Sequence, residues 1–262
     1  MKWTFVIPFF NEVAFLADTV ASLAAQTEKP FRLILVDNAS TDGSADLAHR
    51  LTAGLAGVET IVLHESRPGK LHALEAAMPH ITTELVAFGD ADTWYPPHYL
   101  SVATREFARG GDDLVAVMAV DVPGDDARSS LRRWWRAGVM GRLLPRQTHT
   151  GGFGQTFRTA AFKAAGGYSS RHWSYVLLDH EIMQRVLKHG SARYPIDFWC
   201  IPSQRRGDRR AVRWTLSERL LYHATPFAWK DWYFYRFLGP RLAARRSTQL
   251  SLREKPWETE QR

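Results

Sequence analysis

The sequence predicts an α/β fold in which a mostly parallel sheet is covered by helices on both faces. Three observations support this prediction: five short apolar runs, an amphipathic helical pattern between each pair of them, and polar residues gathered directly after the runs. Strands of a parallel sheet are buried on both faces and read as continuous apolar runs, as these do. The 262 residues suffice for one sizeable core.

The predicted strands are rich in β-branched and aromatic residues, which favour extended backbone. They span residues 3–8, 31–36, 58–63, 84–89 and 113–120. The segments between them repeat apolar residues at helical spacing, over residues 12–26, 43–54, 70–80 and 97–110. This alternation of strand and helix predicts a Rossmann-like order, in which ligands bind outside the carboxyl ends of the strands.

After residue 121 the alternation stops and a polar linker begins. A basic aromatic stretch (131–146) and a glycine-rich return (148–157) come first. They are followed by a short helix ended by a glycine pair (159–168), a helix ended by Gly190 (179–190) and a last strand candidate (196–202). Residues beyond Pro202 are expected to lie peripheral to the core, as a helical segment rich in aromatic and basic residues.

The charge of the chain is unevenly distributed. Residues 1–202 carry 20 basic and 21 acidic side chains, whereas residues 203–262 carry 14 and 6, so the net charge of +7 arises in the C-terminal segment. Aromatic rings mixed with Lys and Arg, as in residues 226–246, are typical of surfaces that face an anionic membrane. An aromatic helix packed on the core with its charges in solvent fits the same residues, and both interpretations remain open.

The location expected from the sequence is cytoplasmic, with a peripheral position on the cytoplasmic face of the membrane as a possibility. Cys200 is the single cysteine, and the N-terminal apolar run is too short for a secretory signal. The longest apolar run, residues 114–120, falls well short of the ~20 residues that span a bilayer.

Asp90 and Asp92 follow the fourth predicted strand and stand two positions apart. Two carboxylates this close repel each other unless a cation joins them. Mg²⁺ or Mn²⁺ takes oxygen ligands, typically one or two carboxylates together with substrate phosphates. Asp is also a common turn and N-cap residue, so the pair indicates a metal site only when a nucleotide site lies beside it.

Two other strand ends provide that nucleotide context. Asp37 closes the second strand, where its carboxylate is suited to accept hydrogen bonds from a base N–H or a ribose hydroxyl. Lys70 follows Gly69 at a predicted helix N-terminus, where free backbone amides and a cation favour an anion. The segment lacks the second glycine and the Ser or Thr of a Walker loop.

The chain resembles the family 2 glycosyltransferases, inverting enzymes of the GT-A fold that use nucleotide-sugar donors. Six motifs over residues 3–190 carry the resemblance, in the family's order: FVIPFFNE, LVDNASTDGS, RPGKLHAL, FGDAD, GGFGQTFRTAAFKAAGGY and LLDHEIMQRVLKHG. The resemblance implies that Pro8, Glu12 and Asp37 border the nucleoside. It places Lys70 near the nucleotide.

The same resemblance makes Asp90 and Asp92 the Asp-x-Asp metal site for Mn²⁺ or Mg²⁺, with Asp92 the more direct ligand. The family's catalytic base is an acid at the start of a helix, often within a Glu-Asp pair. Leu178 stands where the Glu is expected, so Asp179 is the candidate base and Glu181 the alternative. Asp179 also suits a plain N-cap.

The resemblance further suggests a basic loop that closes over the donor diphosphate, with Arg205 and Arg206 as candidates. The sequence pattern and the charge distribution divide the chain into an expected catalytic domain, residues 1–202, and a basic and aromatic tail, residues 203–262. Within the catalytic domain, residues 1–120 form the nucleotide-sugar half and residues 121–202 the acceptor half.

The function expected is inverting transfer of a sugar, from a UDP-sugar, to a glycan or lipid-linked acceptor in cell-surface polysaccharide or glycolipid synthesis, with no nucleic-acid partner. Two alternatives remain. A non-catalytic binder of membranes or nucleic acid would use only the basic tail. A metal-dependent nucleotidyltransferase would release pyrophosphate rather than a nucleoside diphosphate.

Overall fold

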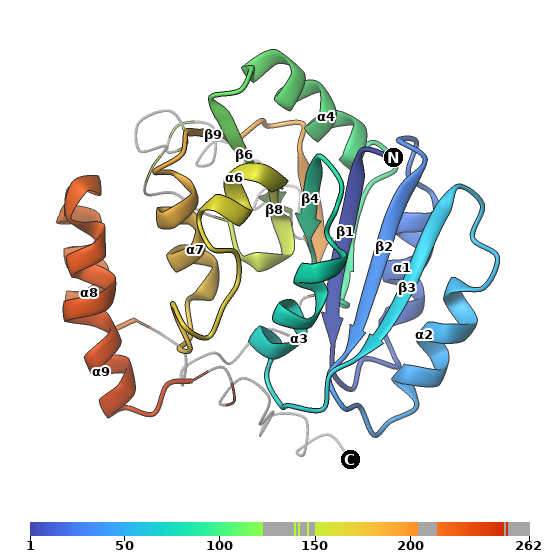
Figure 1. Cartoon of the computed structure of the whole chain (residues 1–262), viewed down its shortest axis with the longest axis horizontal. Helices are drawn as coiled ribbons and strands as arrows, with labels where there is room; N and C mark the ends of the chain where they lie inside the picture. Colours follow the sequence, from blue (N-terminus) through green and yellow to red (C-terminus); the bar gives the residue numbers. More distant parts are fainter. Residues whose placement is uncertain are drawn as a thin grey trace.

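The computed structural model describes residues 1–122, 139, 141, 146, 150–203, 214–248 and 250. These residues form a seven-stranded sheet in the order β3-β2-β1-β4-β8-β6-β9, with helices on both faces (Figure 1). Its strands, in chain order, are β1 (Trp3–Phe9), β2 (Phe31–Asp37), β3 (Val58–His64), β4 (Leu85–Phe88), β6 (Leu114–Met118), β8 (Gln155–Arg158) and β9 (Ser191–Arg193). A second sheet of three short strands contains β5 (Thr93–Trp94), β10 (Trp199–Pro202) and β7 (Val120–Asp121).

The mostly parallel sheet predicted from the sequence is confirmed. β3, β2, β1 and β4 are neighbours and run parallel, and β6 pairs in parallel with β9. β8 is the antiparallel member, between β4 and β6, and it comes from the glycine-rich return where no strand was predicted. The single strand predicted over residues 113–120 was wrong, because the chain leaves the main sheet after Met118 and Val120 pairs with β10.

The helices divide between the two faces of the sheet. One face is covered by α3 (Lys70–Ala77), α6 (Thr159–Ala164) and α7 (Leu178–Val186), and the other by α1 (Leu16–Ala24), α2 (Ser44–Thr52) and α4 (Tyr99–Gly110). Strand side chains alternate between the two cores: Val6 and Phe88 join the first, Phe5 and Ala87 the second. Across the described part of the chain, no helix has the length and apolar character to cross a bilayer.

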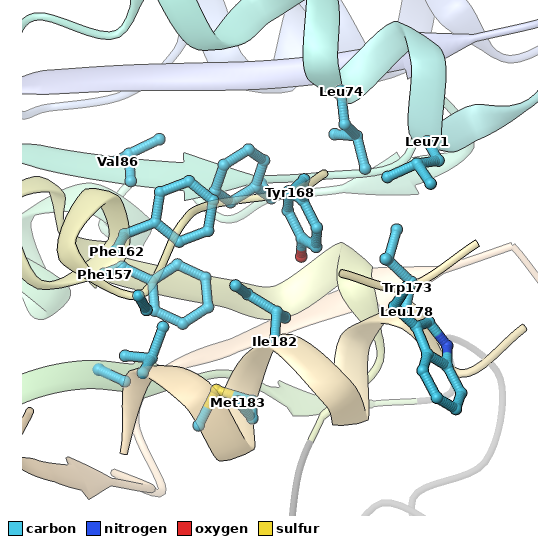
Figure 2. Packing of buried hydrophobic residues seen from close by; sticks show 14 of the residues in the cluster. Leu71, Leu74, Val86, Phe157, Phe162, Tyr168, Trp173, Leu178, Ile182 and Met183 are labelled. Atoms are coloured by element: carbon cyan, nitrogen blue, oxygen red, sulfur yellow. The ribbon is translucent and has the colours of Figure 1, made fainter. Parts of the chain in front are cut away.

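Aromatic rings fix α6 and the chain before α7 against β4. Phe88 lies 5.0 Å from Phe162 and 4.9 Å from Tyr168, measured between ring centroids, and Phe157 lies 5.1 Å from Phe162. Figure 2 shows Phe162 and Tyr168 between the strand that carries Val86 and the helix that carries Ile182. Burying one such side chain contributes roughly 1.5–3 kcal/mol. The packing therefore holds α7 at a defined position beside the end of β4.

The C-terminal segment contains α8 (Leu216–Ala224), the π-helical η5 (Trp232–Leu238) and α9 (Gly239–Ala244). In Figure 1, α8 and α9 lie at the margin of the fold, beyond α7. Their inward side chains nevertheless belong to the same core cluster as α3 and α7: Tyr222, Tyr233, Phe234, Leu238 and Leu242. The peripheral helical segment expected from the sequence thus has a buried aromatic side.

Lys230 is a buried cation within this segment. It is 1% exposed, its ammonium donates a hydrogen bond to the Tyr222 carbonyl, and its Nζ lies 3.5 Å from the centroid of the Tyr222 ring. Burial lowers the pKa of Lys230 from 10.5 to about 8. The folded chain therefore releases this proton at a lower pH than the unfolded chain does.

This difference predicts the pH dependence of stability. Between about pH 8 and 10.5 only the unfolded state keeps the Lys230 proton, so the free energy of unfolding should rise with pH across that window. Below pH 8 both states are protonated and the contribution is constant. Urea unfolding of the wild type and of Lys230→Met at pH 7.5 and 9.5 measures the effect. We expect the wild type to gain stability relative to the variant at pH 9.5, and parallel pH dependences would contradict the assignment.

Candidate active site

The carboxyl ends of β1, β2 and β4 meet at one edge of the sheet. Phe9 pairs with Asp37 across β1 and β2, and Val6 pairs with Phe88 across β1 and β4. Because these strands are parallel, the loops that follow them emerge side by side. The sequence predicts that four strand ends converge on one edge, and the parallel pairing of β3 with β2, where His64 is opposite Asp37, adds the fourth.

The loop after β1 is tied to the loop after β2. The backbone amides of Asn11 and Glu12 donate to the hydroxyls of Ser40 and Ser44, at 3.1 and 2.8 Å. Asn11 has a left-handed backbone, with φ of 52°, which Asn tolerates better than most residues. These side-chain contacts hold residues 10–15 as a loop, so the helix predicted to start at residue 12 begins only at Leu16.

Pro8 and Glu12 both lie at this edge. Pro8 is buried in β1 beyond the residues that pair with β4, and Glu12 is half-buried at the start of the loop. The carbonyl of Glu12 accepts the amides of Phe15 and Leu16, at 3.0 and 2.9 Å. That Pro8 and Glu12 border a nucleoside stays a prediction.

Asp37 is almost completely buried at the end of β2. One carboxylate oxygen accepts the Ser40 amide at 3.0 Å, and the other lies 2.8 Å from Nδ1 of His64. His64 is 64% exposed, so this contact reaches the surface of the molecule. Asp37 thus has a fixed orientation at the edge, and contact with a base or ribose stays a prediction.

Asn38 joins the loop after β2 to the start of α3. Its amide nitrogen donates to the carbonyls of Glu65 and Arg67 at 3.1 and 2.7 Å, and its side-chain oxygen accepts the Gly69 amide at 2.7 Å. Sequence reasoning missed this residue, because its role depends on a loop 27 or more positions away. The three bonds set the position of Lys70, the first residue of α3.

Lys70 brings three separate segments together. Its ammonium forms an ion pair with Asp90. A side chain on Gly152 would place its Cβ 3.5 Å from the Lys70 Nζ, so the glycine-rich return also passes close to the cation. The charge of Lys70 also acts on Asp179. Lys70 is therefore the point at which the end of β4, the return and α7 converge.

Asp90 and Asp92 follow β4 directly, and both are half-buried. The Asp90 amide donates to the hydroxyl of Tyr95 at 3.2 Å, and that hydroxyl donates to the Phe153 carbonyl at 2.9 Å. The Asp92 carbonyl accepts the Ser203 amide at 2.8 Å. The backbone around the pair is therefore fixed by the glycine-rich return and by the end of β10.

The donor set at this point fits a hard divalent cation. Two carboxylates on one short turn supply the oxygen ligands that Mg²⁺ and Mn²⁺ prefer when phosphates complete the coordination. Within the described ranges no group of three or more His, Cys, Asp and Glu side chains gathers to hold a metal. Asp90 and Asp92 would hold the ion, and Asp90 would then give up its ion pair with Lys70.

Asp179 lies in the first turn of α7 with its side chain 23% exposed. Its Oδ1 accepts the backbone amide of His180 at 3.0 Å and lies 3.1 Å from Nδ1 of the same residue, while its carbonyl accepts Nε2 of Gln155 at 3.1 Å. Burial alone would raise the pKa of Asp179, but the contacts with His180 and the charge of Lys70 together lower it below 3.8. The carboxylate is therefore ionised at neutral pH.

Tyr168, a second residue that sequence reasoning missed, confirms how these groups converge. Its hydroxyl donates to Gln155 at 3.0 Å, and burial raises its pKa, with the charges of both Asp179 and Asp90 raising it further. Both carboxylates therefore act on one buried phenol. In the sequence Tyr168 is a tyrosine after a glycine pair, and that pattern does not indicate a hydrogen bond with Gln155.

The remaining candidates lie elsewhere. Glu181 is fully buried, and both of its oxygens are bonded by Arg185, at 2.7 and 2.8 Å. The Glu181 carboxylate is thus enclosed, whereas the Asp179 side chain is partly exposed. Arg205 and Arg206 lie outside the described residues.

Comparison with known proteins identifies the family of the chain. Residues 4–166 match the sequence model of Glycosyl transferase family 2. An uncharacterized glycosyltransferase of Nostoc sp. is 31% identical over 118 residues, which are 45% of this chain and 36% of the relative. The undecaprenyl-phosphate 4-deoxy-4-formamido-L-arabinose transferase of Serratia proteamaculans is 28% identical over 121 residues, 45% of this chain and 37% of that one. The chain thus matches little more than a third of these relatives.

Two solved structures share the fold. A mannosyltransferase of Pyrobaculum calidifontis, in complex with GDP-Man and Mn²⁺, superposes with a TM-score of 0.66 at 22% identity, over 93% of this chain and 73% of that one. TarS of S. aureus, residues 1–349 in complex with UDP-GlcNAc, gives 0.61 at 19% identity, over 99% and 78%. The GT-A fold predicted from the sequence is confirmed.

The electrostatic link between Lys70 and Asp179 is testable without any substrate. Lys70→Met removes a positive charge that stabilises the Asp179 carboxylate, so the pKa of Asp179 should rise. Lys163→Met removes an exposed cation on α6 and serves as the control. A carbon-detected NMR titration of the Asp side chains measures both variants. If Asp179 titrated identically in Lys70→Met and the wild type, the charge of Lys70 would not act on Asp179.

Proposed function

This chain belongs to glycosyl transferase family 2, and we propose that it transfers a sugar from a nucleoside diphosphate donor to an acceptor hydroxyl with inversion at the anomeric carbon. The observation that carries the proposal is the convergence of Lys70, Asp90 and Asp179 at the carboxyl edge of the sheet. A cation and a carboxylate pair suit a sugar diphosphate, and a separate ionised carboxylate suits a base.

Asp179 takes the proton from the acceptor hydroxyl in this reaction. The acceptor oxygen forms a bond to the anomeric carbon from one face, and the bond to the diphosphate oxygen breaks on the opposite face, so the leaving nucleoside diphosphate takes the electron pair. Because the pKa of Asp179 is lowered, the base is already ionised at neutral pH. Its hydrogen bond with the His180 amide fixes the direction of the carboxylate.

Lys70 and the acidic pair act on the departing diphosphate. The Lys70 ammonium, at the N-terminus of α3, offers a positive charge next to free backbone amides. Asp90 and Asp92 would hold Mn²⁺ or Mg²⁺, which when bound supplies charge neutralisation of the leaving group. The mannosyltransferase of Pyrobaculum calidifontis, whose complex includes Mn²⁺, supports this assignment.

The donor we propose is a UDP-sugar and the acceptor a glycan or lipid-linked hydroxyl, in cell-surface polysaccharide or glycolipid synthesis. The TarS complex with UDP-GlcNAc supports the donor, and the undecaprenyl-phosphate transferase of Serratia proteamaculans supports a lipid-linked acceptor. Pro8, Glu12 and Asp37 would border the nucleoside, and Arg205 and Arg206 would close over the diphosphate.

An anionic membrane surface, on the cytoplasmic face, is part of the proposal. Apolar side chains of the C-terminal segment stand exposed: Leu216, Leu220, Trp229, Trp232, Tyr235 and Leu250. Exposed arginines accompany them at positions 219, 236, 241, 245 and 246. Indole rings and arginines together suit the interface of an anionic bilayer, which would bring the cleft to a lipid-linked acceptor.

Product analysis tests the chemistry. We expect incubation with Mn²⁺, acceptor extract and a panel of nucleotide sugars to release nucleoside diphosphate, and Asp179→Asn to slow this release by about 10²–10⁴-fold because it lacks the base. Asp92→Asn should lose activity that added Mn²⁺ only partly restores. Asp112→Asn, an exposed change at the opposite edge of the sheet, is the control. Release of pyrophosphate instead would indicate nucleotidyl transfer, and normal turnover by Asp92→Asn would remove its metal role.

Vesicle flotation tests the membrane surface separately. The protein should float with vesicles containing phosphatidylglycerol at low salt and remain in solution with pure phosphatidylcholine. Trp229→Ser should weaken flotation, since its indole is 66% exposed. Ile196→Ser removes a side chain that is 59% exposed but lies outside the C-terminal segment, and it should have no effect. Protein that stays soluble with both vesicles would exclude the membrane surface.

A further inference from the structure

α7 and the turn that follows it are bonded to the C-terminal segment through three polar side chains. Glu181, Gln184 and Lys188 follow each other at helical spacing, three and then four positions apart. The hydroxyl of Tyr235 donates to Glu181 at 2.5 Å, and Gln184 and Lys188 each donate to Asp231 at 2.8 and 2.7 Å. Residues 231–235 therefore contact α7 and the turn after it through a series of hydrogen bonds.

Glu181 is the most buried member of this set, with no exposed surface. Arg185 binds its two oxygens in a fork, at 2.7 and 2.8 Å, and also donates to the Ala165 carbonyl. A buried carboxylate is costly unless every partner is present. Burial and the charge of Glu181 raise the pKa of Tyr235, so the phenol keeps its proton and remains a donor.

Asp179 lies on the opposite face of the same helical turn. It precedes Glu181 by two residues, which corresponds to a rotation of roughly 200° about the helix axis. The turn has no side-chain cap at its start: Leu177 occupies the N-cap position with a left-handed φ of 66°. Side-chain hydrogen bonds hold this turn from two sides, by Gln155 at the Asp179 carbonyl and by Tyr235 and Arg185 at Glu181.

We propose that Tyr235, acting through Glu181, is a positioning residue for Asp179. The inference rests on the proposed function, in which Asp179 is the base. It extends the active site to the C-terminal segment, beyond the boundary at residue 202 that the sequence suggested. A base works only within hydrogen-bonding distance of the acceptor hydroxyl, so a small displacement of this turn is sufficient to slow the reaction.

Tyr235→Phe deletes the hydroxyl and keeps the ring. Tyr233→Phe is a matched control in the same π-helix, because the Tyr233 hydroxyl is buried and donates to the Glu218 carbonyl of α8 at 2.8 Å, away from α7. We expect Tyr235→Phe to lower kcat about tenfold with the KM for donor unchanged. Tyr233→Phe should lower the melting temperature but leave kcat unchanged.

Hydrogen exchange of the α7 amides adds a readout that needs no activity. The amides of His180 and Glu181 donate to the Leu177 carbonyl, both at 3.1 Å, and they report directly on the first turn. They should exchange faster in Tyr235→Phe than in the wild type or in Tyr233→Phe.

The outcomes separate this inference from the proposed function. Unchanged exchange in Tyr235→Phe would overturn the link between Tyr235 and the turn, whether or not the protein transfers sugar. Unchanged kcat in an active enzyme, or an equal fall of kcat in Tyr233→Phe, would overturn the positioning role and leave the transferase proposal standing. A wild type without transfer to any acceptor would overturn the proposed function and, with it, the role of Tyr235 in catalysis.

Discussion

The candidate site depends on one cation placed among carboxylates. Asp90 and Asp179 come from distant parts of the chain, and two negative groups that act on the same buried phenol repel each other. Lys70 offsets that repulsion, because it pairs with Asp90 and its charge lowers the pKa of Asp179. The three bonds of Asn38 fix the backbone before Lys70. The site thus combines the carboxylates of Asp90 and Asp179 with a positive charge suited to a diphosphate.

The part of this arrangement that the sequence predicts is the part set by local pattern. Continuous apolar runs identify buried strands, parallel strands share an edge, and Asp37 and Asp90 follow their strands directly. What the sequence does not predict depends on pairing between distant segments. β8 enters the sheet antiparallel from a glycine-rich stretch, which carries no strand pattern, and its Gln155 bonds both Tyr168 and the Asp179 backbone.

The C-terminal segment shows why composition alone left two interpretations open. Aromatic residues serve a core and a membrane interface equally well, and only the burial of each ring separates the two roles. Tyr233 and Phe234 are fully buried, whereas Trp229 and Trp232 in the same stretch are exposed. The interpretation of a packed helix therefore describes the inner side of the segment, and the outer side retains the character of an interface.

Burial and charge act on Asp179 in opposite directions, and their balance matters for a base. A carboxylate in full contact with water is a weak base whose orientation is free, whereas a fully buried and unpaired one becomes protonated. Asp179 is between these limits, since it is 23% exposed, and His180 and Lys70 keep it charged. The imidazole of His180 is itself held against Trp214, with ring centroids 5.3 Å apart. An aromatic side chain from beyond residue 202 therefore packs against the residue that contacts the candidate base, and Tyr235, also beyond that boundary, contributes to the position of the base.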